Sequence, residues 1–431
     1  MVIHVVKQGE TIQSIADYYG IEATRLVQDN GLEASNKLVI GQSIVIAIPE
    51  VLYTVNEGDT LEGIANSFGV SIMQLLMNNP FLLDREYIYP GESLVISYSK
   101  KGRITIHGNT NPNIDPGILR KTLPYLTYLS ILNYTATREG DIISYFDDSQ
   151  IVEITKEYGV MPLLLLTTLT IRGEANIVIE FDLLLNKEFQ NRYIENLLRI
   201  IRQKGYQGVN ISFQYINISN ISLYNIFFKL ISDRLNDEGY FVFVTINPNF
   251  ENAEGRDDFE KVDYSILNEF AQNMIFMNYQ WAININPPAP ISSIYSMDVF
   301  INYVNDFISS EKIIIGIPTI GYDWELPFLP GFSSVNSISF DRAVNSARDH
   351  NAIIQFDELS QTPYYIYYDN QIRHIVWFID ARSINALLDL VVKYNLHGSG
   401  IWNITLYNSQ LWLVINSQFE IEKIQITRER N

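Results

Sequence analysis

The stretch "GYQGVNISFQYI", residues 205–216, alternates apolar and polar side chains and decides the fold. Its apolar positions are Val209, Ile211 and Phe213, and its polar positions are Asn210, Ser212 and Gln214. Side chains two residues apart in a strand share one face. The pattern therefore predicts a strand with one face packed on helices and a polar face lining a barrel lumen. Gln214 is expected nearest the C-terminal mouth, where such barrels carry their active sites.

The segments around this strand predict a (β/α)₈ barrel. The preceding stretch 186–205 places Phe189, Tyr193, Leu197 and Ile201 on one helical stripe, and Gly205 can end that helix. Seven further strands are expected in "RITIHG", "LTYLSILNY", "VMPLLLLTTL", "FVFVTINP", "MIFMNYQW", "IIIGIPT" and "SGIWNIT". Amphipathic stretches separate most of them, which favours a closed α/β barrel over residues 102–426.

The first hundred residues contain an internal repeat. Residues 4–30, "HVVKQGETIQSIADYYGIEATRLVQDN", are echoed by residues 53–79, "YTVNEGDTLEGIANSFGVSIMQLLMNN". Each copy begins with a β-branched segment, continues with a threonine, Thr11 or Thr60, that can cap a helix, and closes with a strand. The predicted order of each unit is β-α-α-β, over residues 2–49 and 51–98.

Both repeats resemble the LysM module, whose pattern is nearly complete in the second copy. The matching positions are Gly9, Thr11, Asn30, Gly58, Thr60 and Asn79. The resemblance implies binding to glycans that contain N-acetylglucosamine, such as peptidoglycan or chitin. Two such modules on one chain would gain avidity along a repeating polymer.

The large domain resembles glycoside hydrolase family 18, and in particular the spore-cortex N-acetylglucosaminidases of spore-forming Firmicutes that carry paired LysM modules. The resemblance rests on "KGYQGVNISFQYI", "MNYQW", "IIIGIPTIGYDWELP", "HIVWFIDARSI" and "GSGIWNI". The resemblance implies the substrate-assisted hydrolysis that family 18 uses. A glutamic acid protonates the leaving oxygen, and an aspartate two residues earlier holds the acetamide of the sugar.

The acids that this mechanism needs are missing from the matching positions. Gln214 replaces the proton-donating Glu, Ser212 replaces the Asp before it, Gln207 and Gln280 stand at two further positions where acids are usual, and Ile379 replaces the Glu of "VWFED". Asn210 matches the cortex enzymes. A carboxamide can hydrogen-bond a sugar but cannot deliver a proton. We therefore expect no hydrolysis by the family mechanism, and no rescue by Asp323 or Asp380, which are expected to be structural.

Several aromatic residues fall in the motifs of the barrel rim. Tyr279, Trp281, Tyr322 and Trp402 are candidates for stacking on sugar rings, together with Gln214 as a polar contact. Trp402 is the foremost candidate, whereas Trp324 fits core packing equally well. The five histidines are scattered without metal-binding spacing, and we expect neither a metal nor a cofactor.

Composition excludes some functions. The chain has 49 acidic and 30 basic residues and a formal net charge of −19, which disfavours binding to nucleic acid. It contains no cysteine, so disulfides and thiolate chemistry are excluded. We expect no transmembrane segment and no classical signal peptide. A location in the spore cortex or coat, or at the cell wall, follows only from the resemblance.

Three functions remain open from the sequence. The first is an inactive family-18-like protein that binds peptidoglycan, cortex or chitin-type glycans. The second is a structural protein of a spore layer or inclusion that self-associates through a dead glycosidase scaffold. The third is a residual N-acetylglucosaminidase, which would need a carboxylate to reach the barrel mouth by another route.

Overall fold

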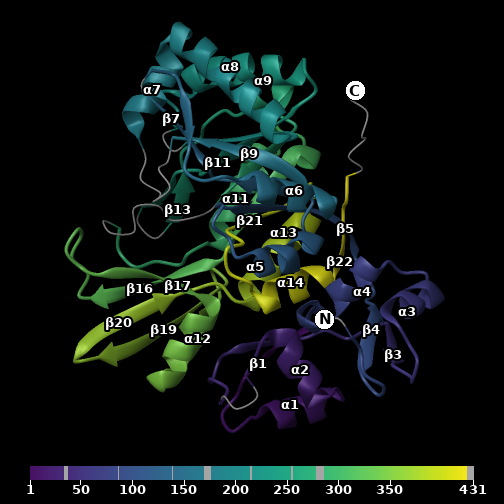
Figure 1. The fold of residues 1–431 in the computed structure, drawn as a ribbon. Coiled ribbons are helices and arrows are strands. Elements are labelled where there is room, and N and C mark those ends of the chain that lie inside the picture. Colours follow the sequence, from purple (N-terminus) through teal and green to yellow (C-terminus); the bar gives the residue numbers. More distant parts are fainter. Residues whose placement is uncertain are drawn as a thin grey trace.

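The computed structural model describes residues 1–33, 37–85, 87–137, 139–168, 176–213, 216–253, 256–277 and 286–424. Figure 1 shows two small modules at one end of the chain, a central barrel, and a separate antiparallel sheet beside it. Within the described ranges, no helix combines the length and the apolarity required to span a membrane.

Each N-terminal repeat folds as the predicted β-α-α-β unit, with an antiparallel pair of strands. The first module contains β1 (Val2–Val5), α1 (Ile12–Tyr19), α2 (Ala23–Asn30) and β2 (Ser43–Ile46). The second contains β3 (Val51–Thr54), α3 (Leu61–Phe68), α4 (Ile72–Asn78), a 3₁₀ turn (Pro80–Asp84) and β4 (Ser93–Ser97). Each module buries its own small apolar core.

The eight predicted barrel strands all form, and their parallel pairing is closed by β21 against β5. They are β5 (Gly102–Thr110), β6 (Tyr128–Ile131), β9 (Met161–Thr167), β10 (Gly208–Ser212), β11 (Phe241–Ile246), β14 (Asn273–Phe276), β15 (Ile313–Pro318) and β21 (Gly398–Trp402). A short ninth strand, β22 (Phe419–Ile421), pairs with the start of β5. The fold class predicted from the sequence is confirmed.

Helices cover the outside of the barrel (Figure 1). They are α5 (Pro116–Thr122), α6 (Ser149–Glu157), α7 (Ile177–Leu185), α8 (Lys187–Lys204), α9 (Ile221–Asn236), α10 (Leu267–Phe270), α11 (Ile294–Val304), α13 (Ala381–Lys393) and α14 (Ser409–Asn416). The predicted stripe of α8 is buried, and Gly205 ends the helix with φ 74°. Phe213 stacks on Phe228 of α9 with ring centroids 5.9 Å apart, which confirms the outward apolar face of β10.

An α+β unit is inserted between β15 and α13, and the sequence pattern did not separate it from the barrel. Its antiparallel sheet has the order β17-β16-β20-β19-β18. The elements are β16 (Ile320–Leu326), β17 (Val335–Ser339), α12 (Phe340–Asp349), β18 (Gln355–Asp357), β19 (Thr362–Asp369) and β20 (Ile372–Trp377). Remaining short elements are 3₁₀ turns (Leu123–Tyr125, Ser310–Lys312) and the hairpins β7 (Tyr134–Ala136) with β8 (Ile142–Ser144) and β12 (Phe250–Ala253) with β13 (Arg256–Phe259).

The two modules dock against each other and against the barrel. Arg25 of the first module donates to the Asn79 side chain at 3.2 Å and to the Asn78 carbonyl at 3.1 Å in the second. On α14, Gln410 donates to Asn30 at 3.1 Å and Asn416 donates to Asn78 at 2.9 Å. Because all three side chains are embedded in these contacts, the modules form one packed body with the barrel.

Candidate functional site

The barrel interior holds a polar network in which Asn210 is central. Its side-chain nitrogen donates to Ser130 Oγ at 3.1 Å, and its Oδ1 accepts from Thr245 at 2.8 Å. His107 Nε2 lies 2.7 Å from the same Ser130 hydroxyl. Burial lowers the pKa of His107 to about 3, so this imidazole is neutral near pH 7. Since Asn210 bonds across to β6, its side chain points into the lumen as predicted.

One layer further along the strands, the lumen is lined by hydroxyl groups. Ser212 lies on the same face of β10 as Asn210, and it pairs in register with Thr167 of β9 and Thr245 of β11. All three residues are buried. Hydroxyls of this kind do not ionise near neutral pH, so this layer supplies hydrogen bonds and no charge.

Four of the predicted site residues, Gln214, Tyr279, Gln280 and Trp281, lie outside the described residues. Gln207 precedes β10 at the opposite end of the strand from the mouth, and its side chain donates to the Gly205 carbonyl at 3.4 Å. The structure therefore places Asn210 and Ser212 together in the lumen, with Gln207 apart from them.

Four carboxylates in the described part of the chain are almost fully buried, and each one is engaged away from the lumen. Asp29 pairs with Arg25 in the first module, and Asp148 accepts from Tyr134 and Tyr206. Glu180 of α7 accepts from Thr168 at 2.6 Å and from Tyr224 of α9. The Tyr224 ring packs on Phe213 and Phe228, on the outer apolar face of β10, which places Glu180 behind the barrel wall.

The fourth buried carboxylate, Asp380, and the carboxylate of Asp323 in the inserted unit also have partners within the fold. Asp380 caps α13 and pairs with Arg382 at 2.7 Å. Asp323 accepts from Tyr367 at 2.6 Å and lies 3.0 Å from His374 Nδ1. Trp324 is completely buried, so core packing is the interpretation that holds for it.

Two predicted aromatic residues of the rim are described. Trp402 ends β21, pairs in register with Asn109 and Pro318, and is half-buried at the mouth of the barrel. Tyr322 of β16 is only 6% exposed, and its ring meets Trp324 edge to face at 5.6 Å. Trp402 thus lies at the mouth with part of its surface exposed, whereas most of the Tyr322 ring is used in packing.

The LysM motif residues build the modules. Gly9 and Gly58 have φ 84° and 90° in the turn before the first helix, a conformation that glycine adopts without strain. Thr11 accepts from the Ser14 amide at 3.1 Å and Thr60 from the Gly63 amide at 3.0 Å, so both predicted helix caps are present.

The two motif asparagines are buried and fasten the second helix to the closing strand. Asn79 donates to the Leu75 and Val95 carbonyls and accepts from the Val95 amide, at 2.7–2.9 Å. Asn30 makes the equivalent bonds to Val45 at 2.7 and 2.9 Å. These bonds explain why the pattern ends each copy with asparagine.

Sequence reasoning missed the acid that follows each turn glycine. Glu10 accepts from the Lys7 amide at 2.7 Å, and Asp59 accepts from the Asn56 amide at 2.7 Å. These backbone bonds lower the pKa of both carboxyls. The repeated spacing of three residues between amide and acid was the signal available in the sequence.

A groove of about 760 Å³ runs along the first module. Its wall combines the β1–α1 turn, α2 and the segment before β2, and the lining includes Gly9, Thr11, Ile12, Val27 and Leu38.

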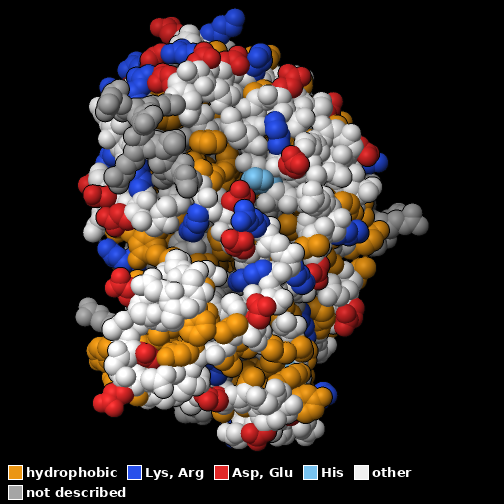
Figure 2. All heavy atoms as spheres, turned by 90° about the vertical axis from the view of Figure 1, so that its right-hand side faces the viewer, with side chains coloured by type: hydrophobic (Ala, Val, Ile, Leu, Met, Phe, Trp, Pro, Cys, Tyr) orange, Lys and Arg blue, Asp and Glu red, His pale blue; other side chains and the backbone are white. Residues whose placement is uncertain are grey.

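In the space-filling view of Figure 2, exposed hydrophobic side chains gather on the lower half of the molecule. Exposed side chains of the second module include Leu52, Phe68, Ile72, Tyr87 and Tyr89. No cluster of metal-ligating residues occurs within the described ranges.

Comparison with known families places these features together. Residues 165–406 match the family described as glycosyl hydrolases family 18, and residues 4–47 and 53–97 match the LysM domain. The chain belongs to glycoside hydrolase family 18. The family-18 match spans β10 and β21, so it includes both the lumen around Asn210 and the rim residue Trp402.

Relatives share the whole architecture with this family-18 chain. The cortical fragment-lytic enzyme of Bacillus subtilis is 31% identical, covering 98% of this chain and 99% of the relative. The enzyme of the same name from Bacillus anthracis is 30% identical with the same coverage. The crystal structure of the spore cortex-lytic enzyme SleL of Bacillus megaterium superposes with a TM-score of 0.78 at 30% identity, over 98% of this chain and 99% of that chain. LysM and family-18 domains together imply binding of N-acetylglucosamine-containing glycans.

Proposed function

We propose that this protein binds an N-acetylglucosamine-containing glycan of the spore or cell wall and does not hydrolyse it. The observation that carries the proposal is the replacement of both mechanistic acids, by Ser212 and Gln214. The neutral layer of Ser212, Thr167 and Thr245 supports it, because these hydroxyls can bind a sugar but cannot stabilise a developing cation by charge.

Loss of the acid removes a necessary step. A glutamine cannot protonate the leaving oxygen, and positioned general acid catalysis contributes about 10²- to 10⁴-fold in rate. The serine at 212 leaves the acetamide without its charged partner, which compounds the loss. The buried carboxylates Asp29, Asp148, Glu180 and Asp380 all have partners away from the lumen, so none of them supports a replacement.

Retention of the binding modules supports a binding role. The first LysM module keeps a groove of about 760 Å³, and Trp402 is part-exposed at the barrel mouth. The relatives named cortical fragment-lytic enzymes align over almost the entire chain, which makes cortex peptidoglycan the glycan to test first.

The test compares the natural protein with Ser212→Asp/Gln214→Glu. Both are incubated with spore-cortex fragments and with chitin oligosaccharides, and products are measured by mass spectrometry. Sedimentation with insoluble cortex measures binding separately. We expect binding by both proteins and cleavage only by the double variant. Each single variant serves as a control, because one restored acid does not rebuild the pair.

Other results would redirect the assignment. Cleavage by the natural protein would contradict the proposed loss of activity and require another acid. If neither protein cleaves the substrates and neither sediments with cortex, the results would favour a structural, self-associating protein.

A further inference from the structure

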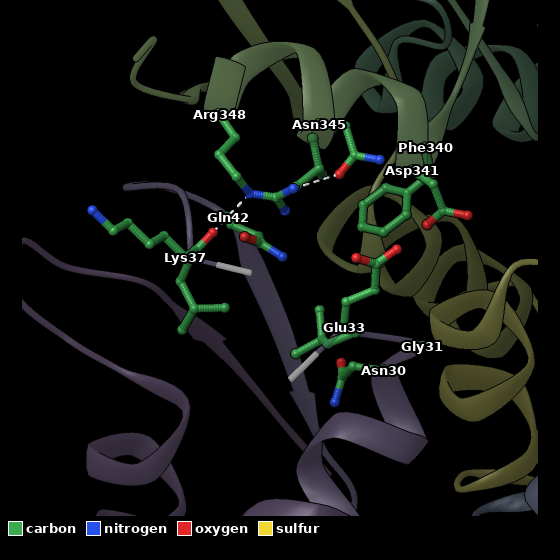
Figure 3. A pocket seen from close by; sticks show the side chains of 12 residues that line it. Asn30, Gly31, Glu33, Lys37, Gln42, Phe340, Asp341, Asn345 and Arg348 are labelled. Carbon is green, nitrogen blue, oxygen red and sulfur yellow. Dashed lines mark hydrogen bonds between the residues drawn. The ribbon is translucent and has the colours of Figure 1, made fainter. Parts of the chain in front are cut away.

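A second cavity lies at the seam between the first LysM module and the inserted unit. Its volume is about 170 Å³. Figure 3 shows that Arg348, Asn345 and Asp341 enter it from α12, while Glu33 and Gln42 enter it from the module. We call this cavity the seam pocket.

The walls of the seam pocket are held by tight docking. Arg348 Nε donates to the Lys37 carbonyl at 2.8 Å, and Ile354 donates to the Ile40 carbonyl at 2.9 Å. At Gly41, φ is 86° and an added Cβ would lie 1.9 Å from the Ile354 carbonyl oxygen. Val39 belongs to the apolar core of the inserted unit. The pocket is therefore preformed by two packed units.

Charges of both signs face this space. Glu33 points toward Phe340 and Asp341 from the module side (Figure 3). Asp341 is an exposed residue of α12, and the desolvation that its carboxyl does undergo raises its pKa. An ammonium group entering here would offset that desolvation, because it offers an opposite charge and hydrogen-bond donors.

Hydrogen-bond donors occupy the opposite side of the seam pocket. Arg348 uses Nε for the Lys37 carbonyl and Nη1 for Asn345 at 2.7 Å, and among the described residues its Nη2 has no hydrogen-bond acceptor, so Nη2 is the donor offered to a ligand. Gln42 is 2% exposed, and its Oε1 accepts from the Val39 amide at 3.0 Å. Its amide nitrogen points into the pocket (Figure 3). This side suits a carboxylate, so the pocket as a whole suits a group with both charges.

The seam pocket meets the groove of the first module. Lys37 and Leu38 line both cavities. A polymer lying in the groove could thus send a covalent branch into the seam. The volume of about 170 Å³ matches a branch end of amino-acid size and excludes a second glycan strand.

We propose that the seam pocket binds the free amine and carboxylate of a short peptide branch on a wall glycan whose sugar chain occupies the adjoining groove. The proposal rests on the proposed function, since it requires that a wall glycan is bound at all. It narrows the ligand to glycans that carry peptide branches and distinguishes them from chitin.

The experiment measures binding of two probes by calorimetry: soluble peptidoglycan strands with stem peptides, and the same strands after amidase has removed the peptides. The proteins are the natural chain, Asp341→Asn, and the control Asp349→Asn. The control removes the same charge from the exposed end of the same helix, outside the seam pocket.

We expect the natural protein to prefer peptide-bearing strands and Asp341→Asn to weaken that binding about tenfold, as for one charge-assisted hydrogen bond. Binding of stripped strands should stay unchanged in both variants. Equal affinity of the natural protein for both probes would overturn the seam proposal and leave the glycan-binding function standing. Equal loss in Asp341→Asn and Asp349→Asn would also overturn it, and binding of neither probe would overturn both proposals.

Discussion

Replacing Asn79 with alanine tests whether the asparagine of the second LysM motif serves the fold or the ligand. Asn79 is completely buried and makes three hydrogen bonds with the backbone of Leu75 and Val95, at 2.7–2.9 Å. Alanine would leave those backbone groups unsatisfied, and each such group costs about 1–3 kcal/mol. With some water entering the gap, we expect the second module to lose about 3–5 kcal/mol of local stability.

Hydrogen exchange of the β4 amides, read by mass spectrometry, measures this loss in the right place. A single global unfolding free energy is a poor measure, because the modules and the barrel need not unfold in one step. Asn66→Ala is the matched control, since Asn66 is exposed on α3 of the same module. A loss below about 1 kcal/mol, together with abolished glycan binding, would refute the structural role, because three broken buried bonds should cost more.

Two further predictions concern the docking and the pH dependence. Gly41→Ala should release the first module from the inserted unit, which would be seen as faster hydrogen exchange of the Ile354 amide. Gly9→Ala is the control and should not have this effect. Both glycines have positive φ, but nothing lies within 4 Å of an added Cβ at Gly9. Much of the Lys423 side chain is exposed, but its Nζ lies against the Leu123 and Leu126 carbonyls, and desolvation there lowers its pKa to about 7. The unfolded chain therefore binds this proton more tightly, and stability should rise with pH between about 7 and 10.5. Lys423→Met should flatten that rise in melting temperature; an unchanged rise would rule out Lys423 as its source.

The local features were predictable from the sequence because their causes are local. Thr11 and Thr60 cap helices through amides three residues away, and Gly205 ends α8 at the residue where the stripe stops. The alternation at Val209, Ile211 and Phe213 likewise reflects only the two faces of one strand. Such patterns carry their own geometry, so the modules and the eight barrel strands could be predicted.

Features that depend on distant contacts could not be predicted. The seam pocket exists because Arg348 reaches Lys37 across 311 positions, and no periodicity encodes that distance. The motif around Tyr322 reads the same whether its ring faces a ligand or packs on Trp324. Only the three-dimensional structure shows that it packs on Trp324. The inserted unit could not be separated from the barrel in the sequence, because apolar and polar residues alternate in its strands as they do in barrel strands. The antiparallel order of these strands appears only once they pair.

The docking contacts made by Arg25, Gln410 and Asn416 change how this chain would meet a polymer. Modules on a loose tether search for any two sites within reach, and their cooperation depends on linker length. Here the groove of the first module and the mouth of the barrel keep a constant separation and direction. A glycan can therefore engage both only where its own path and curvature match that spacing, so the protein would respond to the shape of the wall polymer as well as to its sugars.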